Sequence, residues 1–320
     1  MHHYQIRPFS SHVLRTPLLP LSFYTKIMEK EAVITVFDLL QDPLVYEALQ
    51  LASPELVVMV EKYWENPQSF SNKKATALAF SVLKYGARMA SRSTPFGLFA
   101  GCTVGERGQT TNIVMENKEL FKRHTQLDMQ FWIALLQELA KQEEVKNTLS
   151  YRPNTTLYEV GSFYRYVEYR YKVTKREHSI AALRKTDLLT LEYKKSKQGI
   201  TIEALIELLV DDASEWEDAR FFVNQLIDFQ FLVSDLDGAL TTEKEWDRIH
   251  TILKRVPNFE KTITFFHRLK RQIESLDIGL VPKPNAYTAI KNILTEANVT
   301  FDEKYLFQTD LMTSTSVNTL

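Results

Sequence analysis

The sequence predicts an α+β protein, with helical and mixed β subdomains and an embedded winged helix–turn–helix-like module. Apolar residues recur at helical spacing over 36–64 and 73–92, which predicts amphipathic helices. Aromatic and charged residues alternate over 163–173, which predicts a strand. Three short helical patterns and an apolar strand follow this strand-rich stretch, which is the order of a winged helix–turn–helix.

The composition is that of a folded protein in a reducing compartment. Hydrophobic residues make up 44% of the 320 residues, enough for a large core in two or more subdomains. The net charge is −1, so any cationic site must be local. The single cysteine, Cys102, excludes an internal disulfide framework, and no apolar run reaches the roughly 18 residues of a membrane span. The seven histidines show no metal-ligand spacing. We therefore expect a soluble, cytoplasmic protein without a metal.

The chain is expected to begin with a strand and a set of helices. A short strand over 10–20 should end at Pro17 and Pro20, because proline cannot continue a strand ladder. The helical pattern over 36–64 is broken at Ser53 and Pro54, which predicts two consecutive helices there.

A third helix is expected over 73–92. Pro95 disfavours helical geometry in the residue before it, so this helix should stop near Ser93. Two short strands, around 99–105 and 111–116, should follow as a hairpin. The Arg-His-Thr run over 123–125 is expected at the surface.

The central segment is expected to alternate strands and helices. Asp128 should open a helix that runs to about Lys146, and Thr201 is a natural N-cap. Ser214 and Glu217 match a capping box. The expected helices lie near 187–197, 202–211 and 215–229, and the closing strand near 231–236.

The chain is accordingly expected to divide into three parts. Residues 1–150 form an N-terminal α+β part, and residues 151–240 form the winged-helix-like module. Residues 241–320 form a helical region plus a strand, the start of a larger domain.

Lys84, Arg88 and Arg92 follow one another at four-residue spacing, which places three cations along one side of a helix. The Thr-Pro-Phe-Gly turn that starts at Thr94 adds a hydroxyl group and backbone amides beside them. The planar guanidinium groups of the arginines and the backbone amides of such a turn suit a phosphate-rich ligand. The alternative is a solvated helix face, because cations in a last helical turn also offset the macrodipole.

Glycines and charges around this motif are unevenly distributed. Five of the nine glycines fall within 86–108, which marks an unusual chain path. No acidic residue lies between Glu65 and Glu106, so no carboxylate nearby in sequence neutralises the arginines.

The run from Arg88 to Gly101, RMASRSTPFGLFAG, resembles the N-terminal part of lantibiotic dehydratases. In that family an arginine followed by R-x-T-P-F-G-L-F is the most recognisable block. Further blocks agree in order and extend the resemblance over about residues 10 to 312. They are Leu14-Arg-Thr-Pro-Leu-Leu-Pro20, Ala52-Ser-Pro-Glu-Leu56, Asp128 with Trp132, and Gln308-Thr-Asp-Leu311.

The resemblance implies the N-terminal portion of an enzyme that glutamylates Ser and Thr of a ribosomally made precursor peptide. Glutamyl-tRNA would be the co-substrate, no cofactor would be bound, and a separate domain would then eliminate glutamate to give dehydroamino acids. Transferred by position, the residues that bind tRNA or glutamate would be Arg15, Lys84, Arg88 and Arg92. The catalytic set would be Arg88, Arg92, Thr94, Asp128 and Asp310.

Three of these residues have structural alternatives. Asp310 lies ten residues from the end of the sequence, where its local packing could be incomplete. Asp128 could simply cap the helix that starts at Met129, and Arg15 could pair with a carboxylate in the sheet.

In this family a winged module recognises the leader peptide by adding it as a strand. The resemblance therefore implies a peptide-binding role for the module over 154–237, in which Tyr164, Tyr166, Tyr169 and Tyr171 stack against an apolar peptide. An ordinary amphipathic hairpin is the alternative. A DNA-binding winged helix is disfavoured, because its candidate final helix carries excess negative charge.

The resemblance also implies partners: a precursor peptide with its leader, tRNA(Glu), an elimination domain or the remainder of the enzyme, a cyclase, and a second copy of the chain. Members of the family are several times longer, so we expect an excised N-terminal piece or a truncated product. Two alternatives to an enzyme part remain. One is a non-catalytic module that binds leader peptide and tRNA, and the other is a winged-helix nucleic-acid-binding protein.

Overall fold

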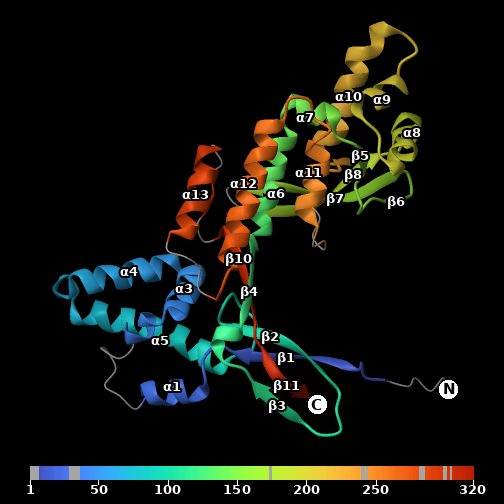
Figure 1. The fold of residues 1–320 in the computed structure, drawn as a ribbon. Coiled ribbons are helices and arrows are strands. Elements are labelled where there is room, and N and C mark those ends of the chain that lie inside the picture. The colour runs from blue at the N-terminus through green and yellow to red at the C-terminus, as the bar shows by residue number, and fades with distance from the viewer. Residues whose placement is uncertain are drawn as a thin grey trace. The chain divides into compact units, whose positions relative to one another are not determined.

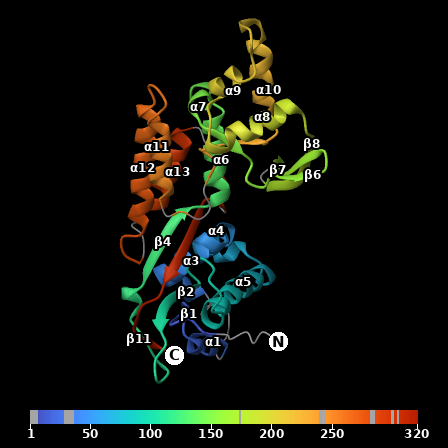
Figure 2. The same cartoon turned by 90° about the vertical axis from the view of Figure 1, so that its right-hand side faces the viewer.

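The computed structural model describes residues 7–28, 37–172, 175–238, 242, 244–280, 285–297, 301–302 and 305–320. The chain forms two compact units. Unit 1 combines Met1–Phe131 with Arg268–Leu320, and unit 2 is the intervening segment Trp132–His267. Both units contain helices and strands, so the predicted α+β class is confirmed (Figures 1 and 2).

The N-terminal part of unit 1 is a helical cluster around an apolar core (Figure 1). The predicted break at Ser53 and Pro54 is confirmed, because Pro54 occupies the first position of a new helix. Asp42 caps the preceding helix by accepting a hydrogen bond from the Leu44 amide at 2.9 Å. The helices are α1 (Leu21–Met28), α3 (Pro43–Ala52), α4 (Pro54–Glu65) and α5 (Asn72–Ser91).

Unit 1 also contains a six-stranded sheet in the order β3-β11-β2-β10-β4, with β1 paired to β2. The two strands expected after α5 are present, but their predicted pairing as a hairpin is wrong. The C-terminal strand β11 lies between β2 and β3 and pairs with both. The strands are β1 (Ser11–Pro17), β2 (Ala100–Glu106), β3 (Asn112–Met115), β4 (Lys122–Leu127), β10 (Phe307–Met312) and β11 (Thr315–Thr319).

The sheet has one buried and one exposed face. Residues paired across strands share a face, as do residues two apart along a strand. Gly101 aligns with buried Leu311, and a Cβ atom added to Gly101 would lie 2.8 Å from the Leu311 carbonyl oxygen. The buried side of β2 therefore needs glycine where β10 approaches it. The opposite face exposes apolar side chains of Val13, Val104 and Met312.

The C-terminal segment returns to unit 1 rather than forming a separate part. The helix α12 (Glu260–Leu276) leads back into this unit, and α13 (Ala286–Glu296) follows it. Arg268 and Glu296 join the two helices by an ion pair of 2.7 Å. The two units thus do not follow the ranges 1–150, 151–240 and 241–320, because β10 and β11 complete the N-terminal sheet.

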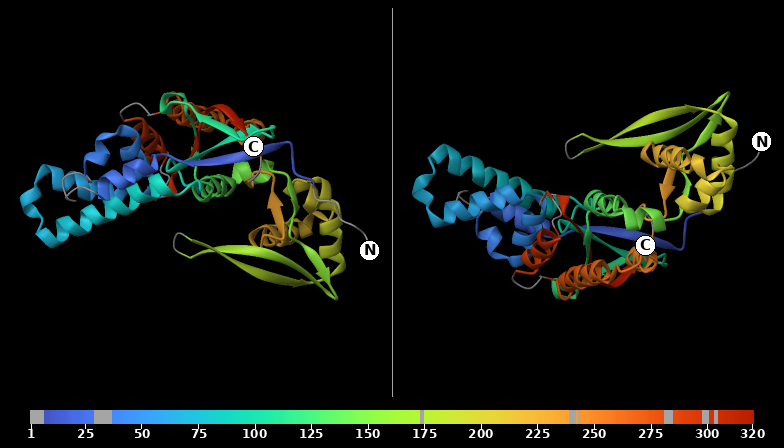
Figure 3. Two further views of the ribbon diagram at one scale, coloured as in Figure 1. Left: turned by 90° about the horizontal axis from the view of Figure 1, so that it is seen from below. Right: turned by 90° about the horizontal axis from the view of Figure 1, so that it is seen from above.

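Unit 2 contains the strands and short helices expected in the central segment. Its three-stranded sheet has the order β6-β7-β8, and Figure 3 shows β7 and β8 in yellow-green as a long hairpin. A separate pair is formed by β5 (Tyr151–Pro153) and β9 (Leu232–Ser234). The remaining strands are β6 (Tyr158–Val160), β7 (Phe163–Lys172) and β8 (Lys175–Arg184).

The helices of unit 2 lie close to their predicted positions. The expected helix after Asp128 is split into α6 (Met129–Ala140) and α7 (Glu143–Thr148). Thr201 caps α9 as predicted, but the capping box at Ser214 is wrong, because α10 begins at Trp216 without a side-chain cap. The others are α8 (Asp187–Lys195), α9 (Ile202–Glu207), α10 (Trp216–Asp228) and α11 (Glu245–Leu253). The assignment as a winged helix–turn–helix stays a prediction.

None of the helices in the described ranges has the length and apolar character needed to cross a bilayer.

Candidate functional site

The three cations of the predicted helix face do not all belong to the helix. Lys84 and Arg88 lie within α5, whereas Arg92 is its C-cap and has an extended backbone with φ −116° and ψ 122°. The Arg92 amide donates to the Arg88 carbonyl oxygen at 3.1 Å. The helix therefore ends near Ser93 as predicted, and Arg92 belongs to the loop that carries the Thr-Pro-Phe-Gly motif.

The motif loop folds back at Gly97. This residue has φ +54°, a left-handed conformation that favours glycine. The Phe99 amide donates to the Phe96 carbonyl oxygen at 3.0 Å, which closes the turn. A Cβ atom on Gly97 would lie 3.9 Å from the carbonyl oxygen of Thr309, so the turn lies beside β10. Thr94 is exposed in this loop.

The Arg88 guanidinium is positioned by aromatic rings. Its Cζ atom lies 4.1 Å from the ring centroid of Phe96 and 5.9 Å from that of Phe99. Its Nε atom is buried, and no described residue accepts a hydrogen bond from it. Cation–π contact orients the group without neutralising its charge.

No carboxylate in the described part of the chain lies within ion-pair distance of Arg15, Lys84, Arg88 or Arg92. The expectation that Arg15 could pair with a carboxylate in the sheet is thus not met among these residues. Four cations in one unit keep their charge available to an external anion.

The segment after β1 connects the strand of Arg15 to the C-terminal end of α5. Beyond β1, the Leu18 amide donates to the Phe99 carbonyl oxygen and the Leu19 amide donates to the Met89 carbonyl oxygen, both at 2.9 Å. These bonds fix the segment after Arg15 beside the residue that follows Arg88. Sequence blocks far apart in the chain thus meet at one end of the sheet.

Asp310 lies on the same exposed face of the sheet as Arg15. Arg15 is paired with Cys102, Cys102 is aligned with Met312, and Asp310 is two residues before Met312 on β10. The Asp310 carboxylate accepts a hydrogen bond from Gln308 at 3.3 Å. The structure thus brings Asp310 to the exposed sheet face, while its role in catalysis stays a prediction.

Asp128 caps α6, which is the structural alternative to a catalytic role. Its Oδ1 atom accepts a hydrogen bond from the Gln130 amide at 2.8 Å, at the start of α6. Its own amide donates to the Leu306 carbonyl oxygen at 2.9 Å, just before β10. A catalytic role for Asp128 stays a prediction.

A buried polar cluster that the sequence did not predict lies beneath the sheet. Arg123 was expected at the surface, but its side chain is 0% exposed and pairs with Glu47 at 2.5 Å. The Tyr287 hydroxyl lies 2.8 Å from the Arg123 Nη2 atom, and Asp277 lies 3.7 Å from the Arg123 Nε atom. One guanidinium thus joins α3, β4, the residue after α12, and α13. The alternation along β4 could have indicated this, because Arg123 stands in phase with buried Thr125 and Leu127.

In unit 2, the tyrosines expected to bind peptide differ in exposure and do not form one surface. Tyr164 and Tyr166 are both 1% exposed and pack against Phe231, so the expectation that they contact a docked peptide is wrong. Tyr169 is half-buried and has Arg176 over its ring at 3.7 Å. The side chain of Tyr171 lies outside the described residues.

The strand β8 is an edge of its sheet within the described residues, because it pairs only with β7. Ile180 on this edge strand is 67% exposed. An exposed edge strand with an apolar side chain is able to receive an added strand.

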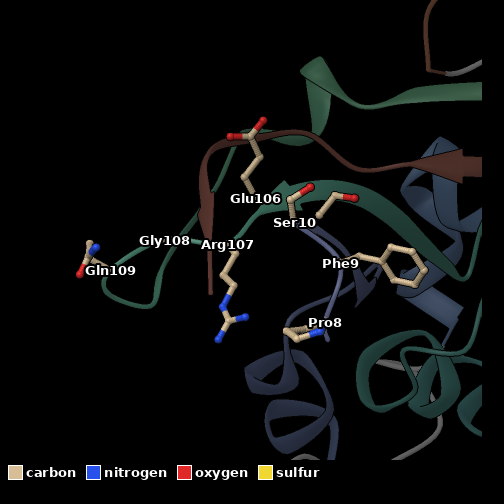
Figure 4. A pocket seen from close by; sticks show the side chains of 8 residues that line it. Pro8, Phe9, Ser10, Glu106, Arg107, Gly108 and Gln109 are labelled. Atoms are coloured by element: carbon tan, nitrogen blue, oxygen red, sulfur yellow. The ribbon is translucent and has the colours of Figure 1, made fainter. Parts of the chain in front are cut away.

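A cavity of about 640 Å³ lies elsewhere in unit 1 (Figure 4). It is formed by the segment before β1 and the turn after β2, at the end of β1 opposite to Leu18 and Leu19. Figure 4 shows Phe9, Glu106 and Arg107 around it. Among the described residues there is also no cluster of three or more His, Cys, Asp or Glu side chains that could hold a metal ion.

The family model described as "Lantibiotic dehydratase, N terminus" matches residues 41–319. The chain is 24% identical over 293 residues to epidermin biosynthesis protein EpiB of Staphylococcus epidermidis, covering 85% of this chain and 28% of EpiB. It is 23% identical over 303 residues to nisin biosynthesis protein NisB of Lactococcus lactis subsp. lactis, covering 92% of this chain and 28% of NisB.

Solved structures share the fold. The tRNA-dependent lantibiotic dehydratase MibB from Microbispora sp. 107891 matches 97% of this chain with a TM-score of 0.71 and 17% identity, over 29% of its own chain. The glutamylation domain TbtB from thiomuracin biosynthesis, bound to 5'-phosphodesmethylglutamycin, matches 90% of this chain with a TM-score of 0.51 and 17% identity, over 34% of its own. The chain thus spans less than a third of the length of EpiB, NisB and MibB. Because the family model matches most of its length, the chain belongs to the lantibiotic dehydratase N-terminal family.

Proposed function

We propose that the chain is the N-terminal portion of a glutamyl-tRNA-dependent enzyme that glutamylates Ser and Thr of a ribosomally made precursor peptide, before elimination to dehydroamino acids. Membership of the dehydratase family supports this proposal, as do the descriptions of MibB as tRNA-dependent and of TbtB as a glutamylation domain. The observation that carries it is the charge-uncompensated guanidinium of Arg88 at the end of α5, next to the loop of Arg92 and Thr94.

The proposed reaction is an ester exchange. The Ser or Thr Oγ atom of the peptide attacks the carbonyl carbon of the glutamyl ester, and the ribose hydroxyl of the tRNA 3′ end leaves. The proton of the peptide hydroxyl is transferred to the leaving ribose oxygen, so no other reactant is consumed. Because the ester is already activated, the protein has to position both substrates and stabilise the negative charge that develops on the carbonyl oxygen.

The side chains of unit 1 suit these tasks. Arg88 and Arg92 would bind the phosphates of the tRNA terminus or the glutamyl carboxylate, because a planar guanidinium binds such anions with two parallel hydrogen bonds. Thr94 supplies a hydroxyl group at the reacting ester. Arg15 and Lys84 extend the cationic surface from β1 and α5.

The two aspartates would have different roles, with Asp310 at the peptide hydroxyl and Asp128 at the start of α6. Asp310 is exposed on the same sheet face as Arg15, where a carboxylate could accept a proton or orient an arginine. Asp128 is committed to capping α6, so its contribution would be to fix the start of that helix.

Leader-peptide recognition is proposed for unit 2, on the edge strand β8. The support is the exposed edge of the β6-β7-β8 sheet and the exposed Ile180 on it. Main-chain hydrogen bonds to β8 would supply affinity, and side chains of alternate residues would supply specificity.

A second candidate is a module that binds leader peptide and tRNA without catalysing transfer alone. Its support is that the cations of unit 1 and the exposed edge strand β8 suit binding of tRNA and peptide by themselves. A winged-helix nucleic-acid-binding role for unit 2 has less support, because the first turn of α10 carries Glu217 and Asp218, which repel phosphate.

One experiment separates these functions. The chain is mixed with glutamyl-tRNA(Glu) and a precursor peptide that carries its leader, and the peptide is analysed by mass spectrometry. A glutamyl adduct that is lost in the Arg92→Ala variant supports the enzyme part. Binding of tRNA and leader without an adduct supports the binding module. If neither tRNA nor leader binds, both functions are refuted.

A further inference from the structure

The outer face of α5 combines exposed aromatic rings with cations. Phe80 is 56% exposed, and the Lys84 ammonium lies 4.9 Å from the centroid of its ring. Two turns further along the helix from Phe80, Arg88 lies over Phe96, which is 41% exposed. The buried side of α5 is formed by other residues, so Phe80 adds little to the core. The residues on the buried side are Leu78, Ala79, Val82, Gly86, Met89 and Ala90.

The charge on this face is not compensated. The helix carries Lys73, Lys74, Lys84 and Arg88 but no acidic residue. Within the described ranges, none of these four cations has a carboxylate at ion-pair distance. A cationic surface with exposed aromatic rings is the composition of sites for single-stranded nucleic acid, in which bases stack on the rings and phosphates meet the cations.

The spacing along α5 matches the spacing of nucleotides. An α-helix rises about 1.5 Å per residue, so Phe80 and Arg88 are separated by about 12 Å along the axis. Consecutive nucleotides of a stacked strand are about 3.4 Å apart along theirs. An RNA strand whose terminus lies at Arg88 thus has a base about three nucleotides away at the level of Phe80.

We propose that Phe80 is a stacking residue for an unpaired base near the 3′ end of tRNA. Lys84 then binds a phosphate between that base and the terminus held at Arg88. When the base stacks, the flexible Lys84 side chain exchanges its contact with the ring for a contact with the phosphate. This inference rests on the proposed function and adds to it the part of the tRNA that α5 recognises.

The test compares two RNA probes: deacylated tRNA(Glu), and the same tRNA trimmed of its unpaired 3′ nucleotides. In the Phe80→Leu variant, affinity for intact tRNA is expected to fall about 5- to 100-fold, the range seen for loss of one stacked base. The salt dependence of binding should stay unchanged, because no phosphate contact is lost. The trimmed tRNA should bind wild type and Phe80→Leu equally. Lys84→Ala should lower the salt slope by about one.

The matched control is Phe221→Leu, which removes a phenyl ring that is 64% exposed on α10. It should bind both probes like the wild type, and thermal melting should show that all variants are folded.

If Arg88→Ala weakens binding but Phe80→Leu does not, the stacking role is refuted and the proposed function stands. Equal weakening of intact and trimmed tRNA by Phe80→Leu would also refute stacking on an unpaired base. If a poly-glutamate peptide displaces intact tRNA from the wild type but not from Phe80→Leu, the partner of this face is an acidic peptide instead. If neither Arg88→Ala nor Phe80→Leu matters, the proposed tRNA site is wrong as well.

Discussion

The Arg88 guanidinium lies 4.1 Å above the ring of Phe96, the aromatic residue of the Thr-Pro-Phe-Gly motif. The motif thus places a ring against an arginine eight residues earlier in the chain. Because the ring neither donates nor accepts a proton, it holds the cation in place and leaves its hydrogen-bonding capacity to a ligand.

The planarity of this arginine is expected to contribute to affinity in addition to its charge. Arg88→Lys keeps the positive charge, so the salt dependence of tRNA(Glu) binding should stay as in the wild type. The affinity should fall roughly tenfold, because lysine cannot form two parallel hydrogen bonds to one phosphate and stacks less well on Phe96. Filter binding at two salt concentrations measures both quantities. A change in slope without a change in affinity would contradict this account.

The positive φ of Gly97 is expected to be required for the loop. Gly97→Ala should lower the free energy of unfolding by about 1–2 kcal/mol, because a Cβ atom is disfavoured in the left-handed region. Gly161→Ala in unit 2 is the matched control, since Gly161 has φ +55° and nothing within 4 Å of an added Cβ atom. Both variants should be destabilised similarly in urea titrations, but only Gly97→Ala should weaken tRNA binding.

The buried Arg123–Glu47 pair is expected to be costly to break. Arg123→Met alone should destabilise the chain by about 3–5 kcal/mol, because it leaves the Glu47 carboxylate buried without its cation. The double variant Arg123→Met/Glu47→Leu should recover much of that loss, since neither charge then remains. Equilibrium unfolding of the two single variants and the double variant gives the interaction free energy between the two side chains. Additive effects would show that the two side chains do not interact.

The stability of unit 2 is expected to fall with rising pH. Burial raises the pKa of Glu192 from 4.5 to about 7, and this residue is 0% exposed. Between these values the unfolded chain releases the proton that the folded chain keeps, so the free energy of unfolding decreases as pH rises through this window. Above pH 7 the free energy of unfolding should be lower by roughly 3 kcal/mol than it is below pH 4.5.

Glu192→Gln isolates this contribution, because it keeps the shape and cannot ionise. The variant should be more stable than the wild type at pH 8, and the two should converge below pH 4.5. Urea unfolding across this pH range measures the difference. Parallel pH profiles would assign the pH dependence to other groups.

Leader binding is expected to depend on the edge of β8. Ile180→Asp should weaken binding of the leader peptide at least tenfold, because it places a charge in the apolar contact beside the added strand. Leu188→Asp on α8, another exposed apolar position in unit 2, is the control and should have little effect. Fluorescence anisotropy of a labelled leader peptide measures both. Equal effects of the two substitutions would refute a specific role for β8.

Local patterns predicted the helices well and the strand pairing poorly. The end of α5 and the cap at Thr201 follow from nearby residues, because proline and threonine act on the adjacent backbone. The insertion of β11 between β2 and β3 depends on residues near the C-terminus, which no local pattern shows. Long-range pairing therefore overturned the expected hairpin.

The candidate site was predicted in part. The motif located Arg88, Arg92 and Thr94, but not the Phe96 ring against Arg88, because that contact depends on the path of the loop between α5 and β2. The alternation of β7 predicted two faces without showing which one is buried, so Tyr164 and Tyr166 were assigned to the wrong environment. Their hydroxyl groups find internal partners, Thr190 and the Phe229 carbonyl, that could not be seen in the sequence.

The salt dependence of tRNA(Glu) binding tests most directly whether the guanidinium groups at the end of α5 bind RNA phosphates. The Arg88→Ala/Arg92→Ala variant should bind more weakly, and its slope of log affinity against log salt should be smaller by about two than that of the wild type. Lys62→Ala, an exposed cation on α4, should change the slope little. A double variant with the affinity and slope of the wild type would contradict the account.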